Sequence, residues 1–304
     1  SCGIRLVTVN KRPFFQPAAS HQPAGPPGGH IWFTEYHSPA SGITVRAEKT
    51  LFTGKSAFQE IALLETEDYG RMLVLDGAIQ TTERDEFVYH EMIVHVPLCT
   101  HPRPRRVLIV GGGDGGCVRE ALRHPEVERV TLVEIDGMVV ELCRKFLPKI
   151  AGSLGNPRVE VCIEDGVRFV KNHKRAFDVI IVDSTDPVNM ASPLTRAPFF
   201  RAAKEALAPG GVYACQSQGP VFEARGMRRI ARTIRKVFPD AAHYLASVPT
   251  YPGGMWSFAL ASKAGKRPAA ASFAPPRPLP KGALTRYYTP EIHRAAFALP
   301  RFVQ

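Results

Sequence analysis

The 304-residue chain has few cysteines, and they form no pattern that would build a metal or disulfide framework. Its six cysteines are scattered without a Cys-x-x-Cys pair, which argues against a structural zinc site or a disulfide-stapled fold. No stretch approaches the roughly 18 uncharged apolar residues that a membrane helix needs. The N-terminal residues also lack the apolar core of a secretory signal. We therefore expect a soluble cytoplasmic protein with reduced cysteines and no membrane association.

Two histidines resemble a metalloprotease pair, but their spacing is wrong for one. His90 and His95 are five residues apart in the sequence HEMIVH. That separation places them about 140° apart around a helix of 3.6 residues per turn, so they cannot bind one zinc ion together. We predict no metal site and no bound cofactor.

The formal net charge of +11 suggests nucleic-acid binding, but most of this charge lies near the ends of the chain. Residues 1–28 contain three basic residues and no acidic ones, and residues 263–304 contain eight basic residues and one acid. The part between them holds 28 basic and 27 acidic residues and is nearly neutral. The tails could make weak, salt-sensitive contacts with polyanions. A specific nucleic-acid site is not expected.

The first third of the chain divides into a leader and a small β-domain. Residues 1–30 are rich in proline and glycine and are predicted to be a disordered leader outside the fold. Within residues 31–84, alternating stretches at 43–52, 58–65 and 72–75 are separated by turn sequences. This pattern predicts short antiparallel strands.

The rest of the chain, residues 85–304, reads as an α/β domain with a C-terminal extension from about residue 263. A helix is predicted over 85–99, and strand and helix patterns then alternate from Arg106 onward. Such alternation predicts a mostly parallel sheet of about seven strands covered by helices. The last two strands are expected to run antiparallel. The predicted strands are 107–110, 130–134, 159–163, 177–182, 212–218, 243–248 and 256–261, and the predicted helices between them are 117–124, 138–147, 166–173, 197–207 and 222–237.

A glycine turn with one acid in it follows the first of these strands. Gly111, Gly113 and Gly116 fit the spacing G-x-G-x-x-G, which lets a backbone and a helix N-terminus approach a nucleotide. The pyrophosphate of a dinucleotide would be repelled by Asp114, which lies among these glycines. Asp114 therefore suits a cation, although it could also serve only as the N-cap of the next helix.

Acidic residues also end the next two strands. Glu134 follows the glycine turn by about 20 residues, where a carboxylate can bind both ribose hydroxyls. Asp165 follows the third strand, where it could accept a hydrogen bond from an adenine amino group while Gly166 leaves room for the ring. An exposed acid at the strand end, for Glu134, and a helix N-cap, for Asp165, are the alternatives.

The fourth strand is followed by the sequence DSTDP, which carries Asp183 and Asp186. Ligand sites in open α/β sheets lie beyond the carboxyl ends of the strands, so these acids and Asp114 are expected in one crevice. Crowded carboxylates raise one another's pKa unless a cation neutralises them, and this loop offers no lysine or arginine before Arg196. Magnesium is one possible cation. A polycationic organic substrate fits better, because no phosphate-binding loop accompanies the acids.

Aromatic residues could complete a pocket for such a substrate. Tyr89 and His90 begin the 85–99 helix, and Tyr251 lies in the late loop PTYPGGMW. Aromatic rings can enclose the methylene chain of an amine and attract its charged ends. The alternative for each of these residues is an ordinary place in the core.

Taken together, these residues resemble the spermidine synthase family, the polyamine aminopropyltransferases, and in particular its bacterial members. The resemblance runs from about Trp32 to Gln304. One departure follows Asp186-Pro187, where Val188-Asn189-Met190 replaces an apolar residue followed by Gly-Pro. The matching segments are residues 75–80, 85–91, the GGGDGG turn, 134–136, 165–166, 183–187, 249–256 and 287–302.

The resemblance implies a methyltransferase-like Rossmann fold behind the N-terminal β-domain. The edges of the N-terminal strands could pair in a homodimer or homotetramer. The resemblance also implies transfer of the aminopropyl group of decarboxylated S-adenosylmethionine, a co-substrate, to a diamine, giving spermidine and methylthioadenosine when the diamine is putrescine. Agmatine, cadaverine or spermidine as acceptor, and a conventional S-adenosylmethionine methyltransferase, remain alternatives. By the family pattern, Gln59 and Glu134 hold the donor's ribose, Asp165 and Gly166 its adenine and Asp114 its propylammonium, Asp183 is the catalytic base, and Tyr89, His90, Asp186 and Tyr251 bind the acceptor.

Overall fold

The computed structural model describes residues 31–186, 189–264, 275, 277–280 and 282–304. The predicted leader, residues 1–30, lies outside the described residues. Pro187 and Val188, the first residue of the divergent segment Val188-Asn189-Met190, also lie outside them. No helix within the described ranges is long and apolar enough to cross a membrane.

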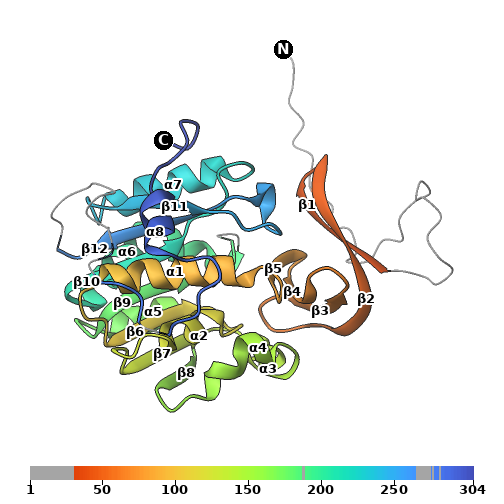
Figure 1. The fold of residues 1–304 in the computed structure, drawn as a ribbon, viewed down its shortest axis with the longest axis horizontal. Helices are drawn as coiled ribbons and strands as arrows, with labels where there is room; N and C mark the ends of the chain where they lie inside the picture. The colour runs from red at the N-terminus through yellow and green to blue at the C-terminus, as the bar shows by residue number, and fades with distance from the viewer. Residues whose placement is uncertain (1–30, 187–188, 265–274, 276, 281) are drawn as a thin grey trace.

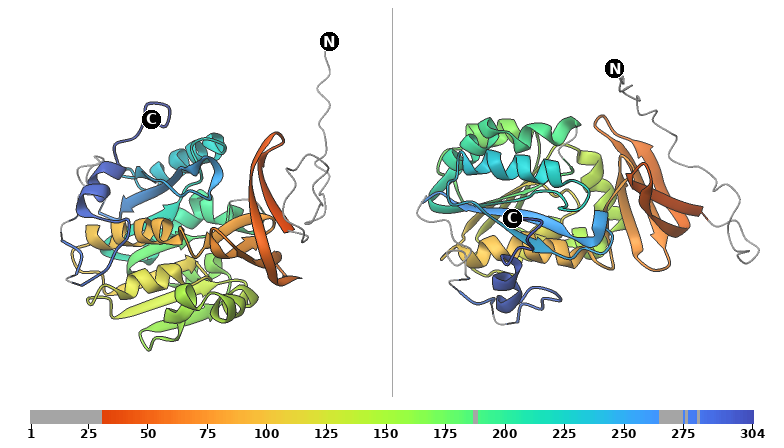
Figure 2. Two further views of the ribbon diagram at one scale, coloured as in Figure 1. Left: turned by 45° about the vertical axis from the view of Figure 1, so that its right-hand side comes forward. Right: turned by 90° about the horizontal axis from the view of Figure 1, so that it is seen from above.

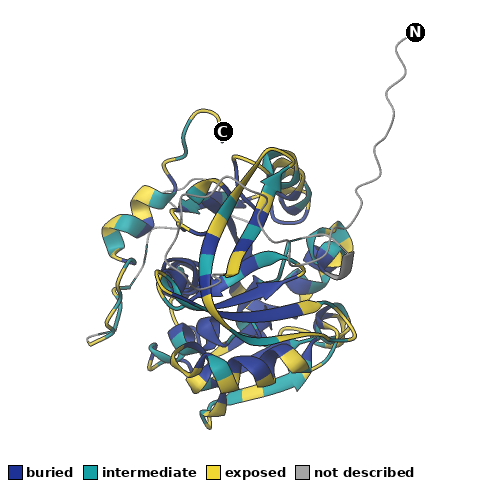
Figure 3. Ribbon diagram, turned by 90° about the vertical axis from the view of Figure 1, so that its right-hand side faces the viewer, coloured by how far each residue is buried: buried dark blue, intermediate teal, exposed yellow. Residues whose placement is uncertain are grey.

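The N-terminal part forms a five-stranded antiparallel sheet in which neighbouring strands follow one another along the chain (Figure 1). Buried and exposed residues occur along the same strands, as Figure 3 shows, because one face packs inward while the other meets solvent. The strands are β1 (Ile31–Ser38), β2 (Ser41–Lys55), β3 (Glu60–Thr66), β4 (Gly70–Leu75) and β5 (Ala78–Thr82).

Three of these strands, β2 to β4, confirm the stretches expected from alternation, whereas β1 and β5 were not predicted. In β1 the inward positions hold Phe33 and the acid Glu35, while the large apolar residues Trp32 and Tyr36 face outward. The strand therefore lacks the usual alternation, in which inward residues are apolar and outward residues are polar. β5 is only five residues long and buries two threonines, Thr81 and Thr82, so it offers no apolar alternation.

The C-terminal part contains a seven-stranded sheet in the order β11-β12-β10-β9-β6-β7-β8. Only β12 runs in the opposite direction to the other six strands, since it pairs antiparallel with both β10 and β11. The two last strands are antiparallel to each other as expected, and β11 again runs parallel to the rest. The strands are β6 (Arg106–Gly111), β7 (Arg129–Glu134), β8 (Val159–Ile163), β9 (Phe177–Asp183), β10 (Leu207–Gln216), β11 (Ala242–Ala246) and β12 (Trp256–Ser262).

Helices cover both faces of this sheet (Figure 2), which confirms the predicted α/β class. Successive residues of a strand point to opposite faces. Val107 and Ile109 of β6 accordingly pack in one core with α1 and α2, and Leu108 and Val110 in a second core with α5, α6 and α7. The helices are α1 (Glu86–Thr100), α2 (Gly116–Leu122), α3 (Gly137–Phe146), α4 (Pro148–Ala151), α5 (Gly166–Asn172), α6 (Ala197–Ala206), α7 (Ala224–Arg235) and α8 (Pro290–Ala296), with 3₁₀ turns η1 (Gly152–Gly155), η2 (Asn189–Thr195) and η3 (Pro252–Gly254).

Helix α1 is buried around almost its whole circumference, because the C-terminal segment crosses it on the side away from the sheet (Figure 1). Glu91 of α1 accepts three backbone N–H groups of that segment, from Arg286, Tyr287 and Tyr288, each at 2.8 Å. Hydrogen bonds to a buried carboxylate are among the stronger ones in proteins. They fix the helix that carries two of the predicted site residues, Tyr89 and His90.

His95 lies away from His90, as the helical spacing requires. Its Nδ1 is 2.9 Å from Nε2 of His124 and its Nε2 is 3.1 Å from Glu120, all in the interior. Burial lowers the pKa of His124 to about 2, with further effects of His95 and Arg277, so that imidazole is neutral. The two histidines of the HEMIVH sequence therefore contact different groups and do not face a common site.

Candidate active site

The turn after β6 packs directly against the end of β9 and the start of α1. Gly111 has a φ of 81°, and a Cβ there would lie 2.1 Å from the carbonyl oxygen of Asp183. The next amide, of Gly112, donates to that same oxygen at 2.7 Å. A Cβ on Gly116 would lie 2.3 Å from the ring of His90. Glycine is needed here for close approach of three elements.

A cavity of about 290 Å³ lies against this turn, at the carboxyl ends of β6, β7 and β9 and beside the N-terminal sheet. It is the crevice expected for an open α/β sheet. All ten residues predicted for the site line it: Gln59, Tyr89, His90, Asp114, Glu134, Asp165, Gly166, Asp183, Asp186 and Tyr251.

Asp183 ends β9, a central strand of the sheet, and its carboxylate has two donors. The hydroxyl of Tyr89 donates to Oδ1 at 2.7 Å, and the thiol of Cys117 donates to Oδ2 at 3.1 Å. Burial, followed by the nearby Asp114, raises the pKa of Asp183, against the opposing effects of His90, Tyr89 and Cys117. A carboxylate with a raised pKa that lines a cavity is a candidate proton acceptor.

Asp114 lies in the glycine turn, one residue before the N-cap of α2. Its Oδ1 accepts the amide of Gly116 at 2.8 Å, and its Oδ2 is 3.3 Å from Nε2 of His90. Burial alone would raise the pKa of Asp114, but His90, Gly116 and Arg119 together bring it below its ordinary value. Asp114 is therefore a carboxylate, and it both supports the turn and faces the cavity.

His90 supplies the counter-charge for these acids. Its Nδ1 is 2.5 Å from Glu86, one helical turn earlier, and its Nε2 faces Asp114. Burial opposes the charge, but Asp114 and Glu86 raise the pKa of His90 well above its usual value, so the ring is an imidazolium. Glu86 is held in turn by Arg119 at 2.8 Å. The sequence search for lysine or arginine missed this cation, although a Glu four residues before a His is a helical pairing signal.

Glu134 and Gln59 both line the cavity and both contact Asp136, in the loop after β7. Glu134 ends β7 and accepts the amides of Gly113 at 3.2 Å and Asp136 at 3.0 Å. Burial raises the pKa of Glu134 to about 7. The side-chain amide of Gln59 donates to Asp136 at 2.8 Å, which links the N-terminal sheet to the loop after β7.

Asp165 is the N-cap of α5, which is one of the two roles weighed for it from the sequence, and its contact with adenine stays a prediction. Its Oδ1 accepts the amides of Val167 at 2.7 Å and Arg168 at 3.4 Å and caps α5, while the residue also lines the cavity. A Cβ on Gly166 would lie 2.4 Å from the side chain of Val110, so glycine allows α5 to start close to β6.

Aromatic rings wall the other end of the cavity. The ring centroids of Tyr89 and Tyr251 are 5.6 Å apart, and Tyr251 donates its hydroxyl to the carbonyl of Gln80 at 2.6 Å. The indole N–H of Trp256 is buried without a hydrogen-bond partner. Asp186 lies 3.5 Å from the amide of Gln218, and burial raises its pKa.

Two acids of the cavity wall, Glu35 and Asp76, were not among the residues predicted for the site. Glu35 of β1 is 7% exposed, lines the cavity, and accepts the amide of Ile79 at 2.7 Å. Burial raises its pKa to about 7, with further contributions from Asp186 and Glu223 and an opposing one from Ile79. The available signal was an acid at an inward position of an alternating segment, two residues after Phe33.

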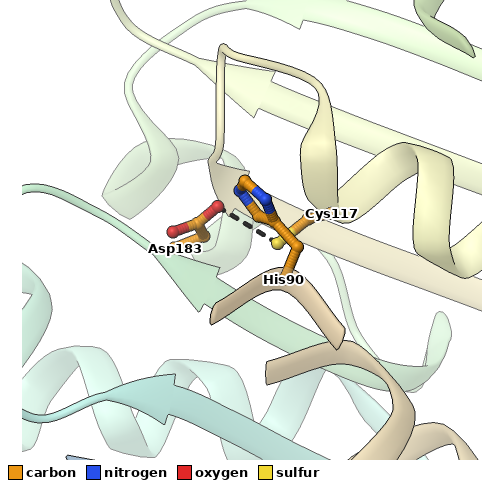
Figure 4. A group of neighbouring side chains, drawn as sticks. All are labelled: His90, Cys117 and Asp183. Carbon is orange, nitrogen blue, oxygen red and sulfur yellow. Dashed lines mark hydrogen bonds between the residues drawn. The ribbon is translucent and has the colours of Figure 1, made fainter. Parts of the chain in front are cut away.

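His90, Cys117 and Asp183 are the described residues that come closest to a metal site, with ligand atoms within 4.8 Å of one another (Figure 4). Metal ligands must be deprotonated. Here both nitrogens of His90 face carboxylates, and burial together with Asp183 raises the pKa of the Cys117 thiol well above its ordinary value. The donor set fits a hydrogen-bonded cluster better than a metal centre.

Comparison with known proteins covers nearly all of the described chain. Residues 86–270 match the spermine/spermidine synthase domain, and residues 31–83 match the spermidine synthase tetramerisation domain. The chain is 53% identical to a polyamine aminopropyltransferase of Moorella thermoacetica, over 90% of this chain and 95% of that protein. It is 50% identical to one of Desulforudis audaxviator, over 90% and 98% respectively.

Solved structures agree with this assignment. A spermidine synthase in complex with the transition-state analogue AdoDATO superimposes with a TM-score of 0.87 at 40% identity, over 93% of this chain and 96% of that one. The spermidine synthase of Thermotoga maritima gives 0.86 at 40% identity, with the same coverage. The fold, the shared sequence and the acid-lined cavity lead to one conclusion. The chain belongs to the spermine/spermidine synthase family of enzymes, the polyamine aminopropyltransferases.

Proposed function

We propose that this enzyme transfers the aminopropyl group of decarboxylated S-adenosylmethionine to putrescine or a similar diamine, giving spermidine and methylthioadenosine when the diamine is putrescine. The observation that supports this most is the charge of the cavity wall. Among the described residues that line the cavity there are seven acids and one histidine, and neither a lysine nor an arginine. Two reactants that are both cationic suit such a wall.

The chemical difficulty is to obtain a neutral amine. An alkylammonium with a pKa near 10.4, taking lysine as a guide, is uncharged in about one molecule in 2,500 at pH 7, which costs roughly 4.6 kcal/mol. The neutral nitrogen then attacks the carbon attached to the sulfonium, the C–S bond breaks, and a neutral thioether leaves without needing an acid. Catalysis therefore reduces to alignment and one proton acceptor. Asp183 is the proposed proton acceptor.

The remaining residues are proposed to hold the two reactants around Asp183. Gln59 and Glu134 bind the donor's ribose, Asp165 and Gly166 its adenine, and Asp114 its propylammonium. In the structure His90 neutralises Asp114. The arriving ammonium would take over part of that role.

Tyr89, His90, Asp186 and Tyr251 form the proposed acceptor site. The facing rings of Tyr89 and Tyr251 suit the methylene chain of a diamine. Asp186 is proposed to pair with the amine that does not react.

Donor binding should depend on pH through Glu134, whose pKa is about 7. The ionised carboxylate accepts the ribose hydroxyls, so affinity should be lost as pH falls below about 7, by up to tenfold per pH unit. Calorimetry with methylthioadenosine, which keeps the ribose, measures this without the ammonium. In Glu134→Gln the slope should disappear. The exposed Glu141→Gln of α3 is the control, and an unchanged slope in Glu134→Gln would reject the role.

A conventional methyltransferase is disfavoured by the same acids. Its donor retains a carboxylate that would face Asp114 and Asp183, two half-buried acids that line the cavity. Comparing the affinities for S-adenosylmethionine and its decarboxylated form separates these functions. Tighter binding of the form that keeps the carboxylate would favour the methyltransferase.

The overall activity is tested by incubating the protein with decarboxylated S-adenosylmethionine and one acceptor at a time. The panel contains putrescine, cadaverine, agmatine and spermidine, and mass spectrometry follows methylthioadenosine and the extended amine. Stoichiometric formation of both products with putrescine is the expected result. A preference for another acceptor would correct the substrate, and no product with any of them would reject the transferase.

Three further proposals concern the state of the enzyme. No cofactor or metal is required, since the proton acceptor and the charged contacts come from the chain itself. Activity in the presence of a chelator tests this.

The protein is proposed to act in the cytoplasm. The free cysteines at all five described positions agree with this proposal, and localisation of a tagged chain tests it. It is proposed to be a homodimer or homotetramer that pairs through the N-terminal sheet, and light scattering measures its mass.

A further inference from the structure

Cys117 does not line the cavity itself, but it contacts the cavity-lining Asp183 from behind, and no proposed binding role explains this contact. It lies in the first turn of α2, directly after Gly116, and its side chain is fully buried. Its sulfur points to the carboxylate of Asp183 across the gap between α2 and the end of β9 (Figure 4). The thiol donates to Oδ2, the oxygen that Tyr89 does not contact.

The two donors come from different helices and hold the carboxylate from both sides. Tyr89 of α1 fixes Oδ1, and Cys117 of α2 fixes Oδ2. Together they prevent rotation of the carboxylate about its Cβ–Cγ bond. Each carboxylate oxygen can accept two hydrogen bonds, so both retain a lone pair for an incoming proton. The thiol stays protonated, because burial, Asp183 and Asp114 all raise its pKa.

We propose that Cys117 is a positioning residue for Asp183, whose S–H bond orients the carboxylate and helps to keep it ionised in the absence of substrate. The inference depends on the proposed role of Asp183 as proton acceptor. A thiol is a weak donor. It therefore orients the carboxylate while reducing its basicity less than a hydroxyl would.

The other titratable groups around Asp183 stay the same when Cys117 is changed. They are Asp114 from the glycine turn, His90 and Tyr89 from α1, and Tyr251 from the loop before β12. A change in the protonation of Asp183 in a Cys117 variant can therefore be assigned to the lost or altered hydrogen bond.

The first test is the pH dependence of kcat/KM in Cys117→Ala and Cys117→Ser. Loss of a donor to an ionised acid favours the protonated form, so the acid limb of Cys117→Ala should move to higher pH by about half to one unit. Cys117→Ser keeps a donor, and its limb should stay at the wild-type position or below it. Cys99→Ala, which removes a buried thiol outside the cavity, should leave the profile unchanged.

The second test does not depend on activity. Cys117→Ala identifies the S–H stretching band of Cys117 by difference infrared spectroscopy, and Asp183→Asn should shift that band in the otherwise intact protein. An unshifted band would overturn the inference, as would equal profiles of Cys117→Ala and wild type. If Asp183→Asn shifts the band but keeps full turnover, the contact is real and the proposed function of Asp183 is the part that fails.

Discussion

Replacing Asp183 with asparagine is expected to lower turnover by about 10² to 10⁴, the usual size of a general-base effect. The asparagine has nearly the same shape, and its single amide oxygen can still accept from one of the two partners of the native carboxylate, Tyr89 or Cys117. It cannot take a proton from the acceptor's ammonium. Turnover should therefore fall while the affinity for the donor remains nearly intact.

Steady-state kinetics with saturating decarboxylated S-adenosylmethionine and a diamine measure this effect. Asp68→Asn, an exposed acid in the turn between β3 and β4, is the matched control and should behave as wild type. Wild-type turnover in Asp183→Asn would show that the proton leaves by another route. A loss of donor affinity equal to the loss of turnover would instead indicate a structural role.

Replacing Asp114 with asparagine is expected to weaken donor binding by about 10- to 100-fold, the range for a hydrogen bond to a charged group. The asparagine can still accept the amide of Gly116, so the turn should persist. It no longer neutralises the propylammonium of the donor. His90 also loses a partner and would oppose a second cation in the cavity.

The product of the proposed reaction provides the control within the same experiment. Methylthioadenosine contains the adenine and the ribose but no ammonium, so its affinity should change little in Asp114→Asn. Calorimetry with both ligands compares the two losses directly. Equal losses would mean that Asp114 supports the nucleotide site as a whole and does not recognise the aminopropyl group.

Most of the architecture could be predicted from local patterns in the sequence. Apolar segments with turn residues between them located every strand of the second sheet to within a few residues, because buried parallel strands are nearly continuous apolar runs. The alternation of strand and helix then required a parallel order, and the strand ends brought Glu134, Asp165 and Asp183 to one edge. β1 was missed, because its outward positions carry Trp32 and Tyr36.

The details of the site could be predicted only in part. Ten residues were expected around one cavity, and all ten line it, since each follows a strand or begins a helix whose place the fold determines. Their assigned roles stay predictions. The cation that balances the acids was sought among lysines and arginines, whereas it is a histidine held between Glu86 and Asp114. Its pKa is raised by these two carboxylates against the effect of burial, and neither influence can be read from the identity of one residue.

The sequence by itself determined the class of fold, the family and the edge of the sheet at which the acids gather, because these depend on periodic patterns and on residues close together along the chain. The tertiary structure alone placed Glu35 in the cavity wall and directed the thiol of Cys117 at Asp183, 66 positions further along the chain. Such contacts depend on how separate elements pack and on which rotamer each side chain adopts. Neither the packing of distant elements nor the rotamer of a side chain can be predicted from the local sequence.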